Sequence, residues 1–274
     1  MEEREPKLGV AVGRKGCGKT YQTTKMIRSY ILGNPAKGVV PRRVLILDVN
    51  DEYEEFKALK VSDVMRFSGH PRIEARRIRP FHDNGQRMTI NEIQDTLFKI
   101  LNDFRNGLLL IEDVNRYISD YLPNDLVGAI CTNRHTDTDI ILHFQSVGRV
   151  SPKIWQNLSW IRFHKNTDSV DKHRTKFEDK YEMLKLVENY VNNEYHNYNN
   201  PRYFCYVDIE DEKIKGIDRK KFETIVEQYI SENYKKLITP MLQRRDLGKG
   251  SKVHTPESAV KLQKQRIINY YLNE

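Results

Sequence analysis

The stretch GRKGCGKT, Gly13 to Thr20, decides the expected fold of this chain of 274 residues. It matches the P-loop pattern G-x-x-x-x-G-K-[ST] at every fixed position. Glycines let consecutive backbone N–H groups converge on phosphate oxygens, and the dipole of the helix that follows favours negative charge. An apolar run at 8–12 precedes the loop, and a helical pattern at 21–32 follows it. This strand–loop–helix unit predicts a nucleotide site.

The side chains of this loop have expected partners on a nucleotide. In this pattern the Lys19 ammonium reaches the β- and γ-phosphates, and the Thr20 hydroxyl is a ligand of Mg²⁺. The expected cofactors are therefore ATP and Mg²⁺. The residues expected to contact the nucleotide run from the first loop glycine into the helix: Gly13, Arg14, Lys15, Gly16, Cys17, Gly18, Lys19, Thr20 and Tyr21.

An apolar run at 107–111 ends in two adjacent carboxylates, Glu112 and Asp113. A P-loop protein needs a carboxylate at the end of such a strand to hold Mg²⁺ and to polarise the attacking water. Neighbouring residues of a strand point in opposite directions, so one carboxylate serves the metal and the other the water. We assign Glu112, with Thr20, to the metal and Asp113 to the water; the reverse assignment of the two acids stays open.

Two further polar residues lie at and just after the end of the strand expected at 139–145. Gln145, at its tip, is placed to hydrogen-bond the γ-phosphate or the attacking water. Arg149, four residues later, lies in a short loop from which a guanidinium can reach its own site or that of a neighbouring subunit, as arginine fingers do. The alternatives are a strand-end cap for Gln145 and a surface arginine for Arg149. The predicted catalytic residues are Glu112, Asp113, Gln145 and Arg149.

Strands alternate with helices from residue 8 to about 165, which predicts an α/β fold with a parallel sheet covered on both faces. A helix with one buried face is expected at 89–102. After residue 166 we expect a charged helix at 168–195, a hairpin of 203–209 with 213–217, a helix at 220–237, a flexible stretch at 246–254 and a last helix at 257–272. The expected domains are an ATPase domain at 1–166, a helical linker at 167–199 and a small α+β domain with a basic tail at 200–274.

The charge of the chain is concentrated in one segment. Lys and Arg number 46 and Asp and Glu 38, a net charge of +8. Residues 235–274 hold nine Lys and Arg against three acids, a net +6, which leaves +2 for the first 234 residues. Such an excess favours a polyanionic partner. A second cluster, Arg72, Arg76, Arg77 and Arg79, is expected to face a DNA backbone, an acidic neighbouring subunit or solvent.

Several classes of protein are excluded by the sequence. The apolar runs are four to six residues long, against roughly 20 for a membrane span, and the start MEEREPK is charged where a signal peptide would be apolar. Three unpaired cysteines fit a reducing compartment, so we expect a cytoplasmic protein with no membrane segment. The acids at 208–212 crowd a hairpin turn, where solvated carboxylates are ordinary, so we expect no nuclease activity.

These motifs together resemble the FtsK/HerA branch of the ASCE P-loop ATPases, over residues 8 to about 165. That branch shows D-x-x-x-E-Y, here Asp48 to Tyr53, a pair of strand-end acids, and a strand that leads from Arg-His to a terminal Gln, here 134–145. The segment VGRVSP at 147–152 resembles the arginine-finger loop of genome-packaging ATPases of small short-tailed phages. The order Glu-Asp departs from the commoner Asp-Glu and leaves the catalytic base open.

The resemblance implies a homo-oligomeric ring, a pentamer or hexamer, that translocates double-stranded DNA into a procapsid, with Arg149 acting on the neighbouring subunit. It also implies that the C-terminal domain, a degenerate nuclease-like module, docks to a portal, procapsid or structural RNA. A cellular or plasmid DNA translocase is the alternative within the branch. A P-loop kinase of small molecules and a nucleotide switch that does not hydrolyse ATP are the alternatives outside it.

Overall fold

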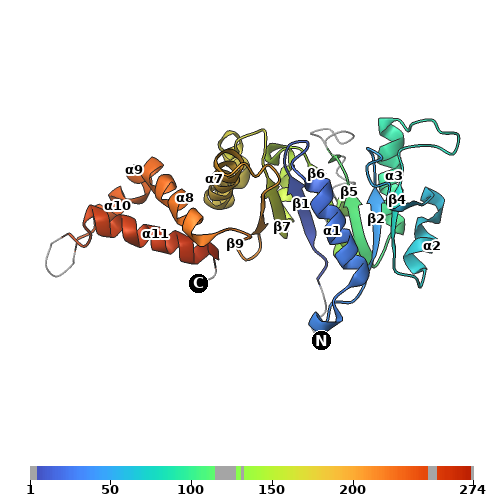
Figure 1. The fold of residues 1–274 in the computed structure, drawn as a ribbon, viewed down its shortest axis with the longest axis horizontal. Coiled ribbons are helices and arrows are strands. Elements are labelled where there is room, and N and C mark those ends of the chain that lie inside the picture. The colour runs from blue at the N-terminus through green and yellow to red at the C-terminus, as the bar shows by residue number, and fades with distance from the viewer. Residues whose placement is uncertain (1–4, 115–127, 131–132, 246–251, 273–274) are drawn as a thin grey trace.

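Nine strands form one sheet across the residues that the structure, a computed structural model, describes, namely 5–114, 128–130, 133–245 and 252–272 (Figure 1). Their order is β3-β4-β2-β5-β6-β1-β7-β8-β9. Neighbouring strands are parallel except in the pairs β7–β8 and β8–β9. The strands are β1 Leu8–Val12, β2 Arg43–Leu47, β3 Lys57–Ala58, β4 Ala75–Ile78, β5 Gly107–Ile111, β6 Thr138–Phe144, β7 Trp160–His164, β8 Phe204–Asp208 and β9 Lys213–Lys215.

Helices cover both faces of the sheet, as the alternation of strands and helices predicts. Successive residues of β5 point to opposite faces. Leu110 belongs to the buried cluster that contains Ile27 of α1, whereas Leu109 belongs to the cluster that contains Leu97 of α3. The helices are α1 Lys19–Leu32, α2 Val64–Gly69, α3 Ile90–Asp103, α5 Pro152–Gln156, α6 Arg174–Phe177, α7 Tyr181–Asn197, α8 Arg219–Glu232, α9 Tyr234–Leu237, α10 Thr239–Leu242 and α11 Pro256–Leu272.

The helix expected at 89–102 begins at Ile90, because hydrogen bonds between Thr89 and Glu92 cap its N-terminus. The Thr89 hydroxyl accepts a hydrogen bond from the backbone N–H of Glu92, and the Glu92 carboxylate accepts one from the backbone N–H of Thr89. This reciprocal pair satisfies two donors that a helix start otherwise leaves open. Ile93, Leu97 and Ile100 then pack α3 against the face of the sheet opposite α1.

Strand β6 lies between the P-loop strand β1 and the strand that carries the two acids, β5. Val12 is paired in register with Phe144, and Leu142 with Ile111, so the carboxyl ends of the three strands meet at one edge of the sheet. Gln145 is therefore at the tip of a strand that neighbours the P-loop strand, as expected. The additional strand confirms the predicted fold class, a P-loop NTPase of the ASCE type.

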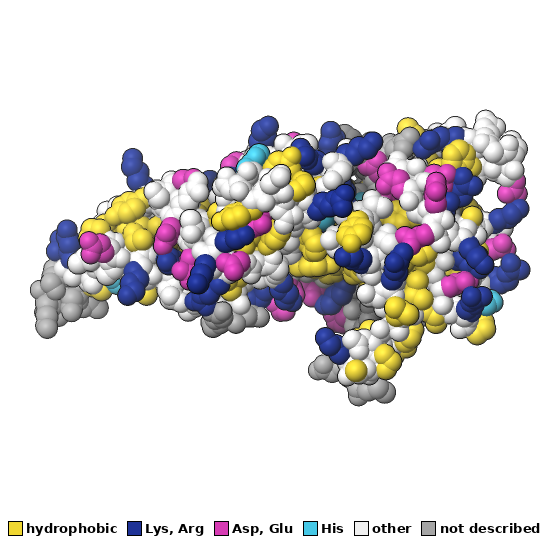
Figure 2. All heavy atoms as spheres, in the orientation of Figure 1, with side chains coloured by type: hydrophobic (Ala, Val, Ile, Leu, Met, Phe, Trp, Pro, Cys, Tyr) yellow, Lys and Arg dark blue, Asp and Glu magenta, His cyan; other side chains and the backbone are white. Residues whose placement is uncertain are grey.

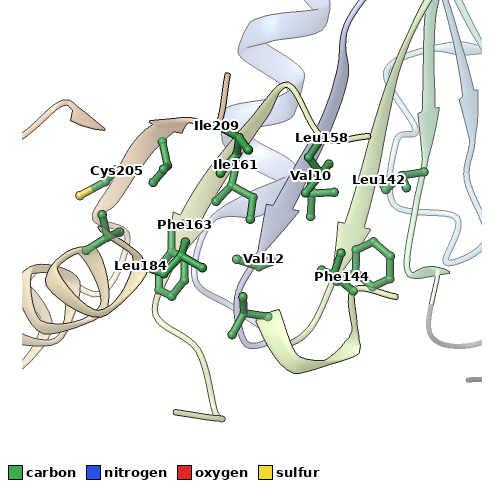
Figure 3. Packing of buried hydrophobic residues seen from close by; sticks show 14 of the residues in the cluster. Val10, Val12, Leu142, Phe144, Leu158, Ile161, Phe163, Leu184, Cys205 and Ile209 are labelled. Carbon is green, nitrogen blue, oxygen red and sulfur yellow. The ribbon is translucent and has the colours of Figure 1, made fainter. Parts of the chain in front are cut away.

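The sheet continues into the C-terminal part of the chain. The expected hairpin is present as β8 and β9, and β8 pairs antiparallel with β7, from Trp160–Asp208 to His164–Phe204. Figure 3 shows the core that results: Val12 of β1 and Phe163 of β7 lie near Leu184 of α7. The domain boundaries at 166 and 199 remain a prediction, and the sheet is continuous across both.

Beyond the sheet, α8 to α11 form an arm at one end of the elongated molecule (Figure 1). The helix expected at 168–195 is divided: 3₁₀ turns at Val170–His173 and Glu178–Lys180 flank α6, and α7 follows. The helix expected at 220–237 is divided at Asn233 into α8 and α9. The expected flexible stretch lies largely outside the described residues. None of the described helices is long and apolar enough to cross a membrane.

Candidate nucleotide site

The P-loop connects β1 to α1 through backbone conformations that favour glycine. Gly18 is the N-cap of α1 with φ 89° and ψ 16°, in the left-handed region. Gly13 has φ 155°, and a Cβ there would lie 2.6 Å from the Cβ of His164 and 2.8 Å from the Sγ of Cys17. The loop is therefore packed directly against the end of β7 at Gly13, which is required by that packing as well as by phosphate access.

The Lys19 ammonium lies over the centre of the loop. Its Nζ donates hydrogen bonds to the carbonyl oxygens of Gly13, at 2.5 Å, and Arg14, at 3.1 Å. Burial lowers the pKa of Lys19, an effect opposed by the neighbouring Cys17 and by the charges of Asp113 and Glu112. A partly desolvated cation at this place interacts strongly with a polyanion, because the local dielectric constant is low.

Carboxylates gather on one side of the loop, where Mg²⁺ is expected. The Thr20 hydroxyl donates a hydrogen bond to Glu52, at 3.2 Å. Glu112 is 4 % exposed, and its pKa is raised to about 8 by burial and then by the charges of Glu52, Asp48 and Asp113. A divalent cation would relieve this repulsion, so the residues present fit Mg²⁺.

Mg²⁺ bound with a nucleotide would need few protein ligands here. Among the described residues, no group of three or more His, Cys, Asp or Glu side chains could hold a metal ion. Mg²⁺ at phosphate sites is bound by one or two protein ligands together with phosphates and waters. Thr20 and Glu112 are the side chains that would hold it.

The motif around Asp48 serves to shape this side of the site. Asp48 is fully buried, and its carboxylate accepts hydrogen bonds from the backbone N–H groups of Glu52, at 2.9 Å, and Tyr53, at 3.0 Å. It also accepts one from Arg77, at 2.8 Å. Asp48 thus holds the turn that presents Glu52 to Thr20, which gives the D-x-x-x-E-Y spacing a structural reason.

Asp113 and Gln145 meet at the ends of β5 and β6. The Gln145 Nε2 donates a hydrogen bond to the Asp113 Oδ1 at 3.0 Å. Asp113 has φ 44°, so the chain turns at this residue as the strand ends. Both side chains line the same cavity as Lys19 and Thr20. Glu112, which is more buried than Asp113, lies on the inner side of this group.

The loop that carries Gln145 and Arg149 is fixed by the chain beyond residue 165. The Ser146 hydroxyl donates to Asp168, and the backbone N–H of Val147 donates to the Asn166 side chain at 2.8 Å. Lys176 donates to the carbonyl of Gly148 at 2.6 Å. Arg149, which ends a 3₁₀ turn at Val147–Arg149, lines the cavity of its own chain.

The cavity has a volume of about 1190 Å³ and contains residues that the motifs do not predict. Arg87 and Asn50 line it near the carboxylates, and Thr167, Asp168 and Arg202 line it from the C-terminal side. Arg202 follows α7, more than 180 residues after the P-loop, and no local pattern in the sequence marks it. The pairing of β8 with β7 helps to bring it to the site.

A layer of buried polar side chains lies beneath α1. The fully buried Arg162 donates hydrogen bonds to the Thr23 hydroxyl and to the backbone carbonyl of Lys19. Thr23 is also 2.8 Å from the Nε2 of His143, whose Nδ1 is 3.8 Å from Glu112. Burial and then the charge of Arg162 lower the pKa of His143 well below its usual range, so the imidazole is neutral. These residues connect the first turn of α1 to the acidic strand end.

The arginine cluster of residues 72–79 is bound within its own chain. Arg77 is buried between Asp48 and Asp51, and Arg79 pairs with Asp51. Arg76 and Arg72 both pair with Glu74, at 2.7 Å and 3.6 Å. The expectation that this cluster faces DNA or a neighbour is therefore wrong for Arg77, whose role is to hold the turn at Asp48.

The acids of the β8–β9 turn are also ion-paired. Glu210 pairs with Lys7 at 2.5 Å, Asp208 with Lys215 at 3.3 Å, and Glu212 with Lys180. They lie in a hairpin of the main sheet rather than in a separate cleft.

The strand order and the P-loop give the chain the fold of P-loop NTPases, and solved structures share that fold. The genome packaging NTPase B204 from Sulfolobus turreted icosahedral virus 2, in complex with ATP-γS, is similar with a TM-score of 0.51 and 17 % identity, over 78 % of this chain and 97 % of that chain. The same protein with AMP gives a TM-score of 0.52 over 79 % of this chain and 99 % of that chain, also at 17 % identity.

A lower similarity links the chain to the N-terminal domain of zonular occludens toxin from Neisseria meningitidis, with a TM-score of 0.35 and 10 % identity, over 58 % of this chain and 76 % of that chain. Neither a protein-family model nor a curated protein matches the sequence. The two B204 structures confirm the predicted P-loop NTPase fold.

Proposed function

We propose that this chain hydrolyses ATP with Mg²⁺ at the carboxyl ends of β1, β5 and β6. The observation that carries this proposal is the convergence of P-loop and strand-end side chains in one cavity: Lys19, Thr20, Glu112, Asp113 and Gln145. Phosphoryl transfer requires mainly positioning and electrostatic stabilisation, and this group supplies a cation, a metal-side carboxylate and a water-side carboxylate.

The residues act in separate steps of that reaction. Backbone N–H groups of the P-loop and Lys19 bind the phosphates, while Thr20 and Glu112 hold the cation. Mg²⁺, when bound, neutralises charge that develops on the transferred phosphoryl group. Asp113, held by Gln145, accepts the proton of the attacking water, whose oxygen forms the new bond to the γ-phosphorus as the bond to the β–γ bridging oxygen breaks.

The test separates binding from chemistry in Asp113→Asn and Glu112→Gln variants. Asp113→Asn should lower kcat at least about 100-fold, with ATP affinity nearly unchanged, because proton acceptance is lost in the transition state alone. Glu112→Gln should raise the Mg²⁺ concentration needed for ATP binding. Phosphate release and calorimetric titration measure the two effects. If Glu112→Gln lowers kcat about 100-fold at saturating Mg²⁺ and Asp113→Asn does not, the roles of the two acids are reversed.

We further propose that hydrolysis drives double-stranded DNA through a homo-oligomeric ring in genome packaging. The net charge of +8 and the similarity in fold to a genome packaging NTPase support this proposal. Figure 2 shows Lys and Arg interspersed with Asp and Glu on the visible face, so a DNA contact on this face rests on individual side chains. DNA should stimulate ATP hydrolysis at low salt, and the stimulation should fall as salt rises. A chain indifferent to DNA would instead fit a P-loop kinase or a nucleotide switch.

In that ring we propose that Arg149 acts on the ATP of the neighbouring subunit. Its place on the exposed rim of the cavity supports this role. Mixing Arg149→Ala subunits with Lys19→Ala subunits tests it, because a mixed pair can form one intact site between an unaltered arginine and an unaltered P-loop. Partial recovery of hydrolysis is expected. No recovery where mixed rings form would mean that Arg149 acts within its own subunit.

The arm is proposed as the docking element for a portal, procapsid or structural RNA. Exposed basic residues gather where α9, α10 and the start of α11 meet: Lys235, Lys236, Arg244, Lys252 and Lys261. A chain ending at residue 245 should keep basal ATP hydrolysis and lose packaging. Equal loss of both would show that α11, which packs on α8, is needed for the fold itself.

A further inference from the structure

The cavity has two different ends because β1 has different neighbours on its two sides. Strands β6 and β5 lie on one side and carry Glu112, Asp113 and Gln145 at their ends. Strands β7 and β8 lie on the other side. In the proposed reaction the terminal phosphate faces the acids, so the nucleoside end of ATP must extend toward β7, β8 and the first turn of α1.

Arg202 stands at this second end. It precedes β8, and its Cβ, Cγ and Cδ lie 3.5–3.7 Å from the position that a Cβ on Gly18 would occupy. Its side chain thus lies along the start of α1, and it lines the cavity. The residue is exposed, and no hydrogen bond or ion pair of its guanidinium is found among the described residues.

Tyr21 stands beside it on the first turn of α1. The side chain is 53 % exposed although it lines the cavity, and the Lys25 ammonium lies 4.5 Å from the centroid of its ring. Arg202, beside Gly18, and Tyr21, three residues further along the chain, line the same cavity. An aromatic ring and an unpaired guanidinium therefore share the nucleoside end of a cavity that is otherwise largely polar.

A contact within the chain holds Arg202 near this position. Arg14 of the P-loop donates a hydrogen bond to the hydroxyl of Tyr195, at 2.5 Å, and its guanidinium lies 4.7 Å from the centre of that ring. Tyr195 is in the last turn of α7, seven residues before Arg202. The end of α7 is thereby attached to the P-loop itself, and the segment that follows it is carried over the start of α1.

We propose that Arg202 and Tyr21 bind the base of the nucleotide by stacking on its faces. The proposal rests on the proposed function, which sets the direction of the triphosphate. A guanidinium plane and a phenol ring both stack on planar aromatic groups. Stacking recognises the π-face that every base has, so it gives affinity with little discrimination between bases. The segment expected as a linker, 167–199, would then place the residue that soon follows it, Arg202, at the ATP site.

Calorimetric titration of the full chain with Mg-ATP and with Mg-tripolyphosphate tests this assignment. Tripolyphosphate carries the phosphates without the nucleoside. Arg202→Ala and Tyr21→Ala should each weaken ATP binding roughly tenfold and leave tripolyphosphate binding within about twofold. Tyr21→Phe keeps the ring and should bind ATP as the wild type does. Arg66→Ala, an exposed arginine on α2 outside the cavity, is the matched control and should change neither affinity.

Arg202→Lys separates stacking from attraction to phosphate. It keeps the positive charge and loses the planar group, so it should weaken ATP binding as Arg202→Ala does. If lysine restores ATP affinity, or if tripolyphosphate affinity falls with ATP affinity in Arg202→Ala, Arg202 binds phosphate and the assignment is overturned. If the wild-type chain binds both ATP and tripolyphosphate, and the variants bind both with wild-type affinity, the assignment of Arg202 and Tyr21 to the base is overturned and the proposed function is not. A wild-type chain that binds neither ligand overturns the proposed function together with it.

Discussion

The two sides of the P-loop are built from different kinds of residues. On the β5–β6 side, acids and an amide converge from strand ends that have recognisable sequence patterns, and the pKa of Glu112 is raised by burial and then by its acidic neighbours. On the β7–β8 side, the loop is packed against His164, Arg14 is attached to Tyr195, and Arg202 crosses the start of α1. The β5–β6 side brings together the carboxylates proposed for the reaction, and these carboxylates repel one another. The second side holds the loop in place.

This difference predicts that substitutions on the β7 side reduce stability most. Gly13→Ala places a Cβ 2.6 Å from the Cβ of His164, whereas a Cβ on Gly16, which also has positive φ, meets nothing within 4 Å. Gly13→Ala should lower the free energy of unfolding by about 2–4 kcal/mol, and Gly16→Ala by about 1 kcal/mol. Urea denaturation followed by fluorescence measures both. Equal losses would show that backbone strain, and not packing on β7, sets the requirement for Gly13.

On the acidic side, removal of a charge should increase stability at high pH. The pKa of Glu112 is about 8 in the folded protein against a usual value of 4.5. Between these pH values the folded state holds a proton that the unfolded chain has lost, so stability falls as pH rises through this range. Glu112→Gln removes this dependence and should raise the melting temperature at pH 8 by several degrees, with little effect at pH 5.

Thermal unfolding without Mg²⁺ at both pH values measures this effect, with Glu54→Gln, an exposed acid of the same region, as the control. A variant that is destabilised equally at pH 5 and pH 8 would mean that Glu112 is ionised and compensated in the folded chain. The acidic side would then not store repulsion, and the comparison between the two sides would fail.

The smallest expected effect concerns the attachment of α7. Tyr195→Phe removes the hydroxyl that accepts a hydrogen bond from Arg14 and keeps the ring beneath its guanidinium. The free energy of unfolding should fall by about 0.5–1.5 kcal/mol, as for loss of one hydrogen bond. Tyr198→Phe, in which the ring contact with Lys221 is kept, should be neutral. If both variants are neutral in urea denaturation, the Arg14–Tyr195 contact adds no stability.

The comparison also explains how much the sequence could predict. Lys19, Glu112 and Gln145 could be predicted as residues of one site because Lys19 belongs to the P-loop and the other two directly follow apolar strands, so that a local pattern places each of them. The role of Asp48 as a buried acceptor for the turn, and of Arg77 as its partner, could not be predicted, because nothing in the sequence around Arg77 separates a buried arginine from an exposed one.

The buried residues beneath α1 and the residues on the β7–β8 side could not be predicted from local patterns, for a different reason. Arg162 and His143 lie within strands, where polar residues are ordinarily assigned to an exposed face, and they are buried because α1 covers that face. Arg202 reaches the cavity through the pairing of β8 with β7 and the contact of Arg14 with Tyr195, long-range contacts that have no sequence signal. The predicted division into domains at 166 and 199 follows a real change in composition, although strand pairing joins the parts.

The central claim is that the P-loop and the strand-end acids form one site for ATP hydrolysis, and steady-state phosphate release by a Lys19→Ala variant tests it most directly. Loss of the half-buried ammonium should abolish measurable hydrolysis, with the folded state retained, because among the hydrogen bonds of the described residues the Lys19 Nζ donates only to carbonyls of its own loop. Hydrolysis by Lys19→Ala at the wild-type rate would contradict the account of this site.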